Sequence, residues 1–282
     1  MSTLPVVLSF GLSDATGASG LQADVLAVAS MGCHPAGVVT AVAASGGTRN
    51  DEWVAIDEDL LEAQGQAVLQ NMPVAAFKVG AIGAMDQLQP IAAILADFDS
   101  VPVVLDPVIG RAGDEDDDGD FAAALRELLI PQTTVLTLGL TQARRLVSLA
   151  EEQVRVDDLS AAACARELIG WGCEFVLIAD AEPGSEQIVN ALYDETGLVR
   201  SDRLPRLEAA TTRIQGAGDT LSAALAGLLA QGLDVPEAMQ EASQYTAAAV
   251  LHSFHAGIGM AIPDRLFWAG DDDDEDAATD DH

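Results

Sequence analysis

The sequence predicts an α/β fold: a single domain in which helices flank a central, mostly parallel β-sheet. Three observations lead to this prediction. Short runs rich in Val, Ile and Leu alternate with longer Ala- and Leu-rich segments of helical periodicity. The short runs are apolar almost throughout, as is typical of strands covered on both faces. Regular alternation of strand and helix implies right-handed crossovers, and therefore parallel neighbours in one sheet.

Each predicted strand is short and apolar. In chain order the strands are 6–10, 37–42, 75–79, 101–106, 134–137 and 175–179. Segments with the apolar spacing of helices lie around them. These helices are 20–31, 59–71, 86–98, 121–129, 159–171 and 236–251. Residues 188–193 and 198–203 flank Asp-Glu-Thr-Gly, which predicts a hairpin and hence a small antiparallel edge of the sheet.

The chain of 282 residues suits one large domain, and no Pro/Ser-rich linker or internal repeat divides it. We therefore expect one domain over residues 1–270. Two acidic runs depart from its composition: an insert at 114–120 and a tail at 271–282. Dense like charge without apolar partners does not form a packed core, so both runs are predicted to be disordered.

Charge and apolar pattern argue against several classes of function. A formal net charge of −32 disfavours a nucleic-acid surface. No apolar stretch reaches the length of about 18 residues that a membrane span needs, and the start of the chain lacks the basic residues of a secretion signal. Cys33, Cys164 and Cys173 show no metal or disulfide pattern, so we expect reduced, structural thiols in a cytoplasmic protein.

The acidity has two interpretations. Lys78 is the only lysine, and the remaining basic residues are arginines. A surface rich in Asp and poor in Lys is typical of a salt-adapted cytoplasm, where high ionic strength screens self-repulsion. The alternative is an ordinary protein that happens to be acidic.

The segment with the clearest chemical signal is Gln-Gly-Ala-Gly-Asp-Thr at 215–220, followed by a small-residue helix at 221–230. The first amides of a helix have no partner within it, and the helix dipole adds positive charge there. Glycines let an anion approach this backbone closely. Asp219 would place a carboxylate beside the anion, where it can accept a proton from an attacking hydroxyl. The alternative is a simple turn with an N-capping Asp.

This segment resembles the Gly-Ala-Gly-Asp-Thr signature of the ribokinase-like superfamily. Residues 9–24 resemble the Gly-x-Asp-x-Ser-Gly-Gly-Ala-Gly-Ile-Gln-Ala-Asp segment of hydroxymethylpyrimidine/phosphomethylpyrimidine kinases. Further matches follow in the same order and spacing at 40–48, 78–80, 104–108, 111–114 and 136–143. The resemblance covers roughly residues 5–265, nearly the whole predicted domain.

The resemblance implies a ribokinase-like domain that uses ATP and Mg²⁺ to phosphorylate hydroxymethylpyrimidine, its monophosphate or both, in thiamine biosynthesis. Asp219 would be the general base, and Asp106 would help to hold Mg²⁺ through water. The phosphate-binding residues would be Gly216, Ala217, Gly218 and Arg111. The pyrimidine would be surrounded by Asp24, Val42, Ser45, Ala81 and Val108. By the same resemblance the protein would pair as a homodimer.

Several positions depart from the family pattern. Ser45 replaces a pyrimidine-binding glutamine, and Gly139 and Gln142 replace an Asn and a Glu that support metal and phosphates. Residues 178–181 read Ile-Ala-Asp-Ala where the family has Lys-Gly-Gly-His, and Asp219 stands where many of these kinases have cysteine. Two alternatives therefore stay open: a pyridoxal-type vitamin kinase on the same scaffold, or a pyrimidine-binding relative that does not catalyse.

Two further polar residues lie near the predicted site. Lys78 ends a buried strand at the carboxyl edge of the sheet, where it would either contact a ligand or extend to solvent. Asp14 would either point into the pocket or stabilise an Asx turn, and we favour the turn.

Overall fold

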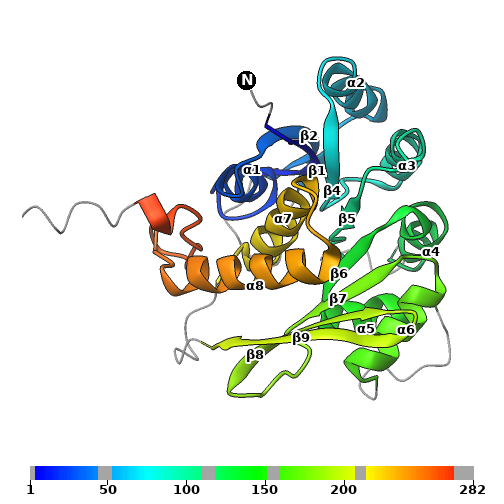
Figure 1. Ribbon diagram of the computed structural model, residues 1–282. Helices are drawn as coiled ribbons and strands as arrows, with labels where there is room; N and C mark the ends of the chain where they lie inside the picture. The colour runs from blue at the N-terminus through cyan, green and yellow to red at the C-terminus, as the bar shows by residue number, and fades with distance from the viewer. Residues whose placement is uncertain (1–3, 44–52, 110–117, 151–158, 207–213, 270–282) are drawn as a thin grey trace, which may run out of the picture.

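The structure is a computed structural model, and it describes residues 4–43, 53–109, 118–150, 159–206 and 214–269. Within these ranges the strands form a nine-stranded sheet in the order β3-β2-β1-β4-β5-β6-β7-β8-β9. Helices cover both of its faces (Figure 1). The predicted α/β class is confirmed.

The central strands are parallel and match the six predicted segments. They are β1 (Val6–Asp14), β2 (His34–Ala43), β4 (Val74–Val79), β5 (Val103–Leu105), β6 (Val135–Gly139) and β7 (Phe175–Ala179). The predicted hairpin is confirmed as β8 (Gln187–Asp194) and β9 (Gly197–Pro205), antiparallel at one edge. The opposite edge carries β3 (Trp53–Ala55), also antiparallel, which is too short to give a sequence signal.

Three helices cover one face of the sheet: α1 (Gly20–Ser30), α7 (Ala217–Ala230) and α8 (Val235–Leu251). The other face carries α2 (Glu58–Leu69), α3 (Leu88–Ala96), α4 (Asp118–Leu128), α5 (Leu140–Ala150) and α6 (Ala161–Gly170). Short 3₁₀ turns lie at Met85–Gln87, Ile130–Gln132 and Phe267–Ala269. The prediction missed α5, since its segment was matched to a family motif rather than to a helix.

The prediction that the whole acidic insert is disordered is wrong for its last three residues. Residues 118–120, predicted to be disordered, form the first turn of α4. Acidic side chains at a helix N-terminus interact favourably with its dipole, and Phe121, next in the chain, packs against the core. The rest of the insert and the tail lie outside the described residues.

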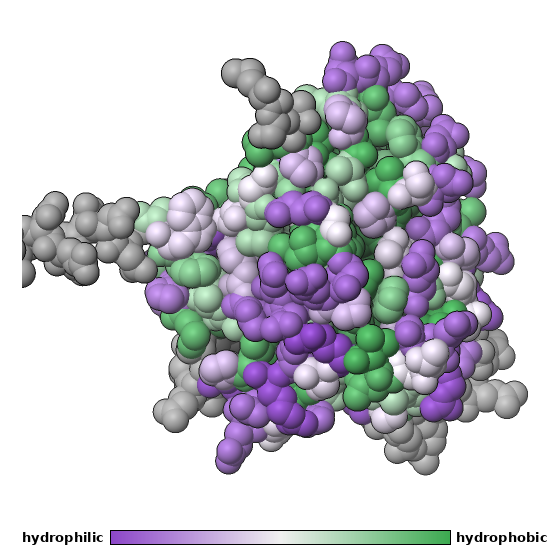
Figure 2. All heavy atoms as spheres, in the orientation of Figure 1, coloured by the Kyte–Doolittle hydropathy of each residue, from purple (hydrophilic) through white to green (hydrophobic). Residues whose placement is uncertain are grey.

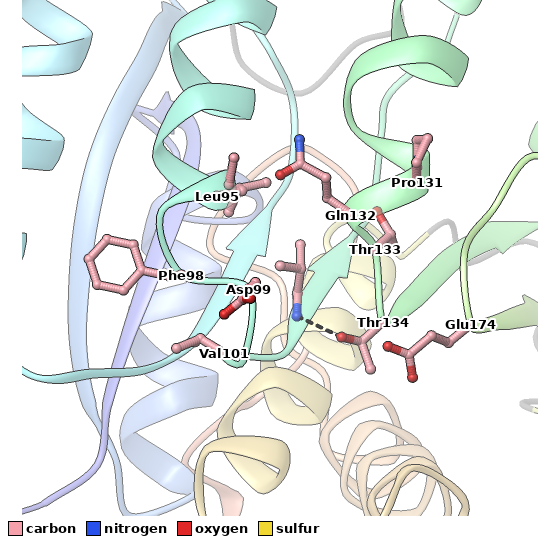
Figure 3. Close-up of a pocket in the computed structure, with 11 residues that line it drawn as sticks. Leu95, Phe98, Asp99, Val101, Pro131, Gln132, Thr133, Thr134 and Glu174 are labelled. Atoms are coloured by element: carbon pink, nitrogen blue, oxygen red, sulfur yellow. Dashed lines mark hydrogen bonds between the residues drawn. The ribbon is translucent and has the colours of Figure 1, made fainter.

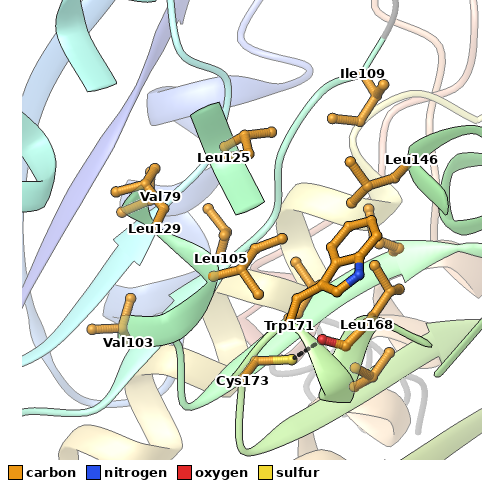
Figure 4. Close-up of a cluster of buried hydrophobic side chains, with 14 of the residues drawn as sticks. Val79, Val103, Leu105, Ile109, Leu125, Leu129, Leu146, Leu168, Trp171 and Cys173 are labelled. Atoms are coloured by element: carbon orange, nitrogen blue, oxygen red, sulfur yellow. Dashed lines mark hydrogen bonds between the residues drawn. The ribbon is translucent and has the colours of Figure 1, made fainter. Parts of the chain in front are cut away.

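Strand alternation divides the interior into two cores. Leu8 and Phe10 of β1 face the α2–α6 layer, whereas Val7 faces the α1, α7 and α8 layer. Figure 4 shows part of the first core, where Trp171 lies among leucines of several elements. Beside it the thiol of Cys173 donates to the carbonyl of Leu168 at 3.4 Å.

The cysteine prediction is confirmed for burial. Cys33, Cys164 and Cys173 are free and buried. Burial raises the pKa of Cys173 to about 12, so its thiol stays protonated at neutral pH.

The viewed surface is mixed in hydropathy. Figure 2 shows hydrophilic side chains over much of the viewed face, with smaller apolar areas between them. Within the described residues, no helix is long and apolar enough to cross a membrane.

Candidate active site

The start of α7 is built around a glycine that a residue with a Cβ cannot replace without strain. Gly216, the N-cap, has φ +83°, and a Cβ there would overlap the carbonyl oxygen of Ala18. Its own carbonyl accepts hydrogen bonds from the backbone N–H (3.0 Å) and the hydroxyl (2.7 Å) of Thr220. Ala217 and Gly218 begin the helix, and Gly218 is exposed. The first amides lack intrahelical acceptors, so the turn offers donors and a positive dipole end to an anion.

A buried lysine contacts Asp219 from the sheet. Nζ of Lys78 lies 2.9 Å from Oδ1 and 3.1 Å from Oδ2 of Asp24, and 3.4 Å from Oδ1 of Asp219. Alternation in β4 directs Lys78 and Ala76 toward α7. Gly80 leaves room for the ammonium, because a Cβ there would lie 2.8 Å from Nζ. The side chain of Asp219 is 25% exposed, so its carboxylate stands between this buried pair and solvent.

Neither alternative considered for Lys78, contact with a ligand or extension to solvent, describes its position. The lysine neither reaches solvent nor lies open to a ligand, since none of its side chain is accessible. Asp24, predicted to line the pyrimidine pocket, is buried as well, and both of its oxygens face the ammonium. A buried charge requires a partner, which explains why the two residues pair. Contact between Asp24 and a pyrimidine stays a prediction.

Burial and mutual attraction determine the charges of this cluster. Burial raises the pKa of Asp24 to about 7, although the ammonium of Lys78 acts against the rise. Burial by itself would lower the pKa of Lys78, but Asp24, Asp219 and Asp106 outweigh it and raise that pKa above its ordinary value. Lys78 therefore remains positively charged at neutral pH.

A second carboxylate is tied to the same helix. Asp106 follows β5, and the hydroxyl of Ser222, three residues after Asp219, donates to its Oδ2 at 2.6 Å. Burial raises the pKa of Asp106, against the hydrogen bond from Ser222. Within the described ranges, no group of three or more His, Cys, Asp or Glu side chains could hold a metal. A metal here would need Asp106 together with water and phosphate oxygens, which is how Mg²⁺ is usually bound.

The loop after β1 is held by Asp14, and the favoured Asx turn is confirmed. Its carboxylate accepts hydrogen bonds from the amides of Thr16 (2.9 Å) and Ser19 (3.0 Å) and from both hydroxyls (2.8 and 2.7 Å). Burial acts to raise the pKa of Asp14, but these hydrogen bonds outweigh it and hold the pKa below its ordinary value. The loop leads into α1 and so positions Asp24 against Lys78.

The remaining predicted pocket residues divide into two groups. Val42 near the end of β2 and Val108 after β5 expose 45% and 44% of their surface, and Ala81 after β4 is nearly buried. Exposed apolar side chains at this edge of the sheet suit an aromatic ring. Ser45 and Arg111 lie outside the described residues.

The positions that depart from the family pattern also lie at the carboxyl edge. Gly139 ends β6 and is exposed. Gln142 follows in α5, and its Oε1 is buried without a hydrogen-bond partner in the described part of the chain. In the loop after β7, Asp180 pairs with Arg206 at 2.6 Å. The charge of Arg206 is therefore already compensated.

A separate cavity of about 230 Å³ lies at the amino ends of the parallel strands, away from the carboxyl ends where Asp219 and Asp106 lie (Figure 3). Residues that precede the strands line it, among them Val101, Thr133 and Glu174. The amide of Val103 donates to the hydroxyl of Thr134 there, at 3.1 Å. Because Asp219 and Asp106 lie beyond the carboxyl ends of the strands, this cavity is not part of their site.

Three residues that contact Asp219, Asp106 or the start of α7 were not predicted from the sequence. Lys78 was noted but not assigned its partners, and Ser222 and Arg265 were not noted at all. The burial of the only lysine in an apolar strand was a usable signal for Lys78. Ser222 and Arg265 carry no local signal, because their partners lie far away in the chain.

Comparison with known proteins identifies the family. The family model for phosphomethylpyrimidine kinase matches residues 14–263. The chain belongs to the phosphomethylpyrimidine kinase family. The hydroxymethylpyrimidine/phosphomethylpyrimidine kinase of Rhizobium meliloti is 30% identical over 259 residues, which cover 90% of this chain and 94% of the relative.

Pyridoxal-type kinases are similar to a comparable degree. The pyridoxine kinase of Bacillus subtilis is 31% identical over 254 residues, 88% of this chain and 90% of the relative. The crystal structure of an ADP complex of Bacillus subtilis pyridoxal kinase superposes with a TM-score of 0.80 at 28% identity, covering 94% of this chain and 100% of that one. Membership of this kinase family indicates a phosphotransferase that acts on a vitamin or vitamin precursor.

Proposed function

We propose that this protein transfers the γ-phosphoryl group of ATP to hydroxymethylpyrimidine, its monophosphate or both, with Asp219 as general base. The observation that carries the proposal is the partly exposed carboxylate of Asp219 in the first turn of α7, beside Gly218 and in contact with the ammonium of Lys78. A base next to a set of amide donors is the arrangement that phosphoryl transfer to a hydroxyl requires.

In this reaction the substrate oxygen bonds to the γ-phosphorus, the bond to the β-phosphate oxygen breaks, and ADP leaves. The hydroxyl proton passes to Asp219. Lys78 contacts Oδ1 of Asp219, which orients the carboxylate and leaves its other oxygen to accept the proton. The amides of Ala217 and Gly218 would stabilise charge on the transferring group, and Arg111 would approach it from the loop after β5.

Asp106 is the residue we propose for the metal. It supplies a hard carboxylate oxygen after β5, and water and phosphate oxygens would complete the coordination. Mg²⁺, when bound, would neutralise phosphate charge. Ser222 would fix the orientation of Asp106 through its 2.6 Å hydrogen bond.

The substrate ring would lie against Val42, Ala81 and Val108, with Ser45 and Asp24 as polar neighbours. Thiamine biosynthesis is the pathway that this assignment implies, and the free, buried cysteines support a cytoplasmic location. The similarity to Bacillus subtilis pyridoxine kinase favours pyridoxal as the second candidate substrate. A third candidate is a relative that binds the ligand without turnover. It is favoured by Gly139 and Gln142, which replace family residues that support metal and phosphates.

A substrate panel separates these candidates. Purified protein is incubated with Mg-ATP and hydroxymethylpyrimidine, its monophosphate or pyridoxal, and ADP release is measured. Release with the pyrimidines supports the proposal, and release with pyridoxal alone supports the second candidate. Thermal stabilisation by a pyrimidine without ADP release would support the third.

The sharper probe is Asp219→Asn, which retains the shape of the side chain but removes the base. We expect kcat to fall by about 10²- to 10⁴-fold, as is usual when a general base is lost. Glu182→Gln is the matched control, because Glu182 is 52% exposed and pairs with the exposed Arg203. Turnover by Asp219→Asn at the wild-type rate would rule out the role of Asp219 as base.

A further inference from the structure

One arginine, distant in sequence from the motifs described above, contacts the start of α7. The side chain of Arg265, in the segment after α8, is only 2% exposed. Its Nε donates to the hydroxyl of Thr220 at 2.9 Å. Its Nη2 donates to the carbonyls of Ala18 at 2.7 Å and Gly216 at 3.2 Å. A single guanidinium thus joins the loop before α1, the N-cap of α7 and the first turn of that helix.

We infer that Arg265 is a positioning residue of the phosphate site, which orients the α7 amides and supplies a buried positive charge behind them. The inference rests on the proposed function, because it takes the start of α7 as the place where the γ-phosphate lies. It assigns this task to a side chain that the family motifs quoted above do not include.

The orientation follows from the planarity of the peptide bond. The carbonyl of residue 216 and the amide of Ala217 belong to one peptide unit and point in opposite directions. The carbonyl of Gly216 accepts hydrogen bonds from Thr220 and Arg265, which draw it toward the interior. The amide of Ala217 must therefore point outward, to the place where an anion would approach. Loss of Arg265 would remove one of the three hydrogen bonds that hold this peptide unit in place.

The guanidinium of Arg265 is stabilised by the charges of Asp219, Asp24 and Asp14, but it has no direct carboxylate contact among the described residues. Its acceptors are two carbonyls and a hydroxyl, all neutral. Among the described residues, no carboxylate lies within ion-pair distance of its guanidinium. Burial nevertheless lowers the pKa of Arg265, so a further anion close to it would stabilise its charge. A phosphate at the start of α7 would be such an anion.

Among the described residues, two other basic side chains near this edge have carboxylate partners. Lys78 faces the carboxylates of Asp24 and Asp219, and Arg206 pairs with Asp180. Residues 178–181 carry no lysine. Arg265 therefore adds a positive charge at the start of α7 to the one proposed for Arg111.

The backbone of Arg265 is held as firmly as its side chain. Its carbonyl accepts hydrogen bonds from the hydroxyls of Ser30 and Tyr245, both at 2.7 Å. These residues belong to α1 and α8, so two helices fix the arginine relative to the start of α7. This is the rigid support that a positioning residue needs.

The test compares Arg265→Lys, which keeps the charge, with Arg265→Gln, which keeps a donor but no charge. Arg203→Gln is the matched control, because Arg203 is 51% exposed. The Kd of Mg-AMP-PCP is measured by calorimetry, together with kcat and KM for the vitamin substrate. We expect Arg265→Gln to weaken nucleotide binding and to lower kcat by about tenfold or more, with KM for the vitamin unchanged. Arg265→Lys should recover a large part of both.

Equal Kd values for the wild type and Arg265→Gln would overturn the inference, as would equal losses in the Lys and Gln variants. Should neither variant fold, Thr220→Val carries the test, because it removes the acceptor of Nε. An unchanged Kd in that variant would overturn the inference. A wild type that binds Mg-AMP-PCP but phosphorylates no vitamin would refute the proposed function alone, whereas no binding at all would refute both.

Discussion

At the scale of single residues, the pairing of Lys78 with Asp24 shapes the site more than any exposed group. Both side chains are almost fully buried, and the pair holds an ammonium against Asp219. Ion pairs of this kind add little net stability compared with apolar residues of the same size, but breaking one by removing a single partner is costly. The pair is therefore better explained by the chemistry of the site than by the stability of the fold.

The net stability of the pair and the cost of removing one partner can be compared with Lys78→Met, Asp24→Leu and the double variant. Lys78→Met leaves a buried carboxylate unpaired, and we expect it to lower the free energy of unfolding by about 3–5 kcal/mol near pH 8. The double variant should recover most of that loss. Urea denaturation measures all three, and a double variant no more stable than Lys78→Met would contradict the prediction.

The cost of Lys78→Met should also depend on pH. Burial raises the pKa of Asp24 to about 7 in the wild type, where the ammonium of Lys78 acts against the rise. Without that ammonium, the pKa of Asp24 in the variant should be higher still. A raised carboxyl pKa means that the folded state binds more protons than the unfolded chain, so stability is lost as pH rises. The variant should lose stability over a wider pH range than the wild type.

At the scale of elements, the start of α7 shows how backbone geometry forms a candidate anion site. Gly216 adopts a left-handed conformation, which lets the chain turn sharply into the helix. The same turn brings it so close to Ala18 that a side chain would collide with the backbone. Sequence patterns identified these glycines, but the reason for Gly216 became evident only from the neighbouring loop.

Three glycine variants separate the effect of a positive φ from the effect of overlap with the neighbouring backbone. Gly216→Ala meets both a positive φ and a backbone overlap, Gly232→Ala meets only a positive φ of +91°, and Gly218→Ala meets neither. A positive φ costs an alanine roughly 1–2 kcal/mol, whereas alanine is favoured over glycine within a helix. Thermal melting should therefore rank Gly218→Ala highest, Gly232→Ala below the wild type and Gly216→Ala lowest. Equal melting of the 216 and 232 variants would show that the overlap relaxes freely.

At the scale of the whole molecule, the dominant feature is a net charge of −32 over the full chain, acidic tail included. Like charges at this density repel one another in the folded state more than in an expanded chain. The surface in Figure 2 shows where hydrophilic side chains gather, whereas Lys78 and Arg265, two of the few basic residues, are buried. Salt in the medium should therefore matter to the stability of this protein.

The salt hypothesis predicts that the unfolding midpoint rises steeply with KCl concentration. Screening shortens the range of repulsion from about 10 Å at 0.1 M salt to about 3 Å at 1 M. A parallel series in sucrose controls for preferential exclusion, which stabilises folded proteins without screening charge. A midpoint that does not change with KCl would favour the alternative of an ordinary acidic protein.

The sequence by itself determined the alternation of strands and helices, the antiparallel hairpin and the glycine-rich segment before α7. These features are local: periodicity and turn composition depend on neighbours within a few residues. The edge strand β3 and helix α5 were missed because β3 has only three residues and the α5 segment was read as a family motif.

Only the tertiary structure decided what surrounds Asp219. Lys78 and Asp219 are separated by 141 residues in the chain, and Arg265 and Ala18 by 247, so no local pattern can pair them. Their meeting depends on strand order, which places β1 beside β4 and brings α7 over both. Sequence periodicity shows which face of an element is buried, but it does not show which distant element that face will meet.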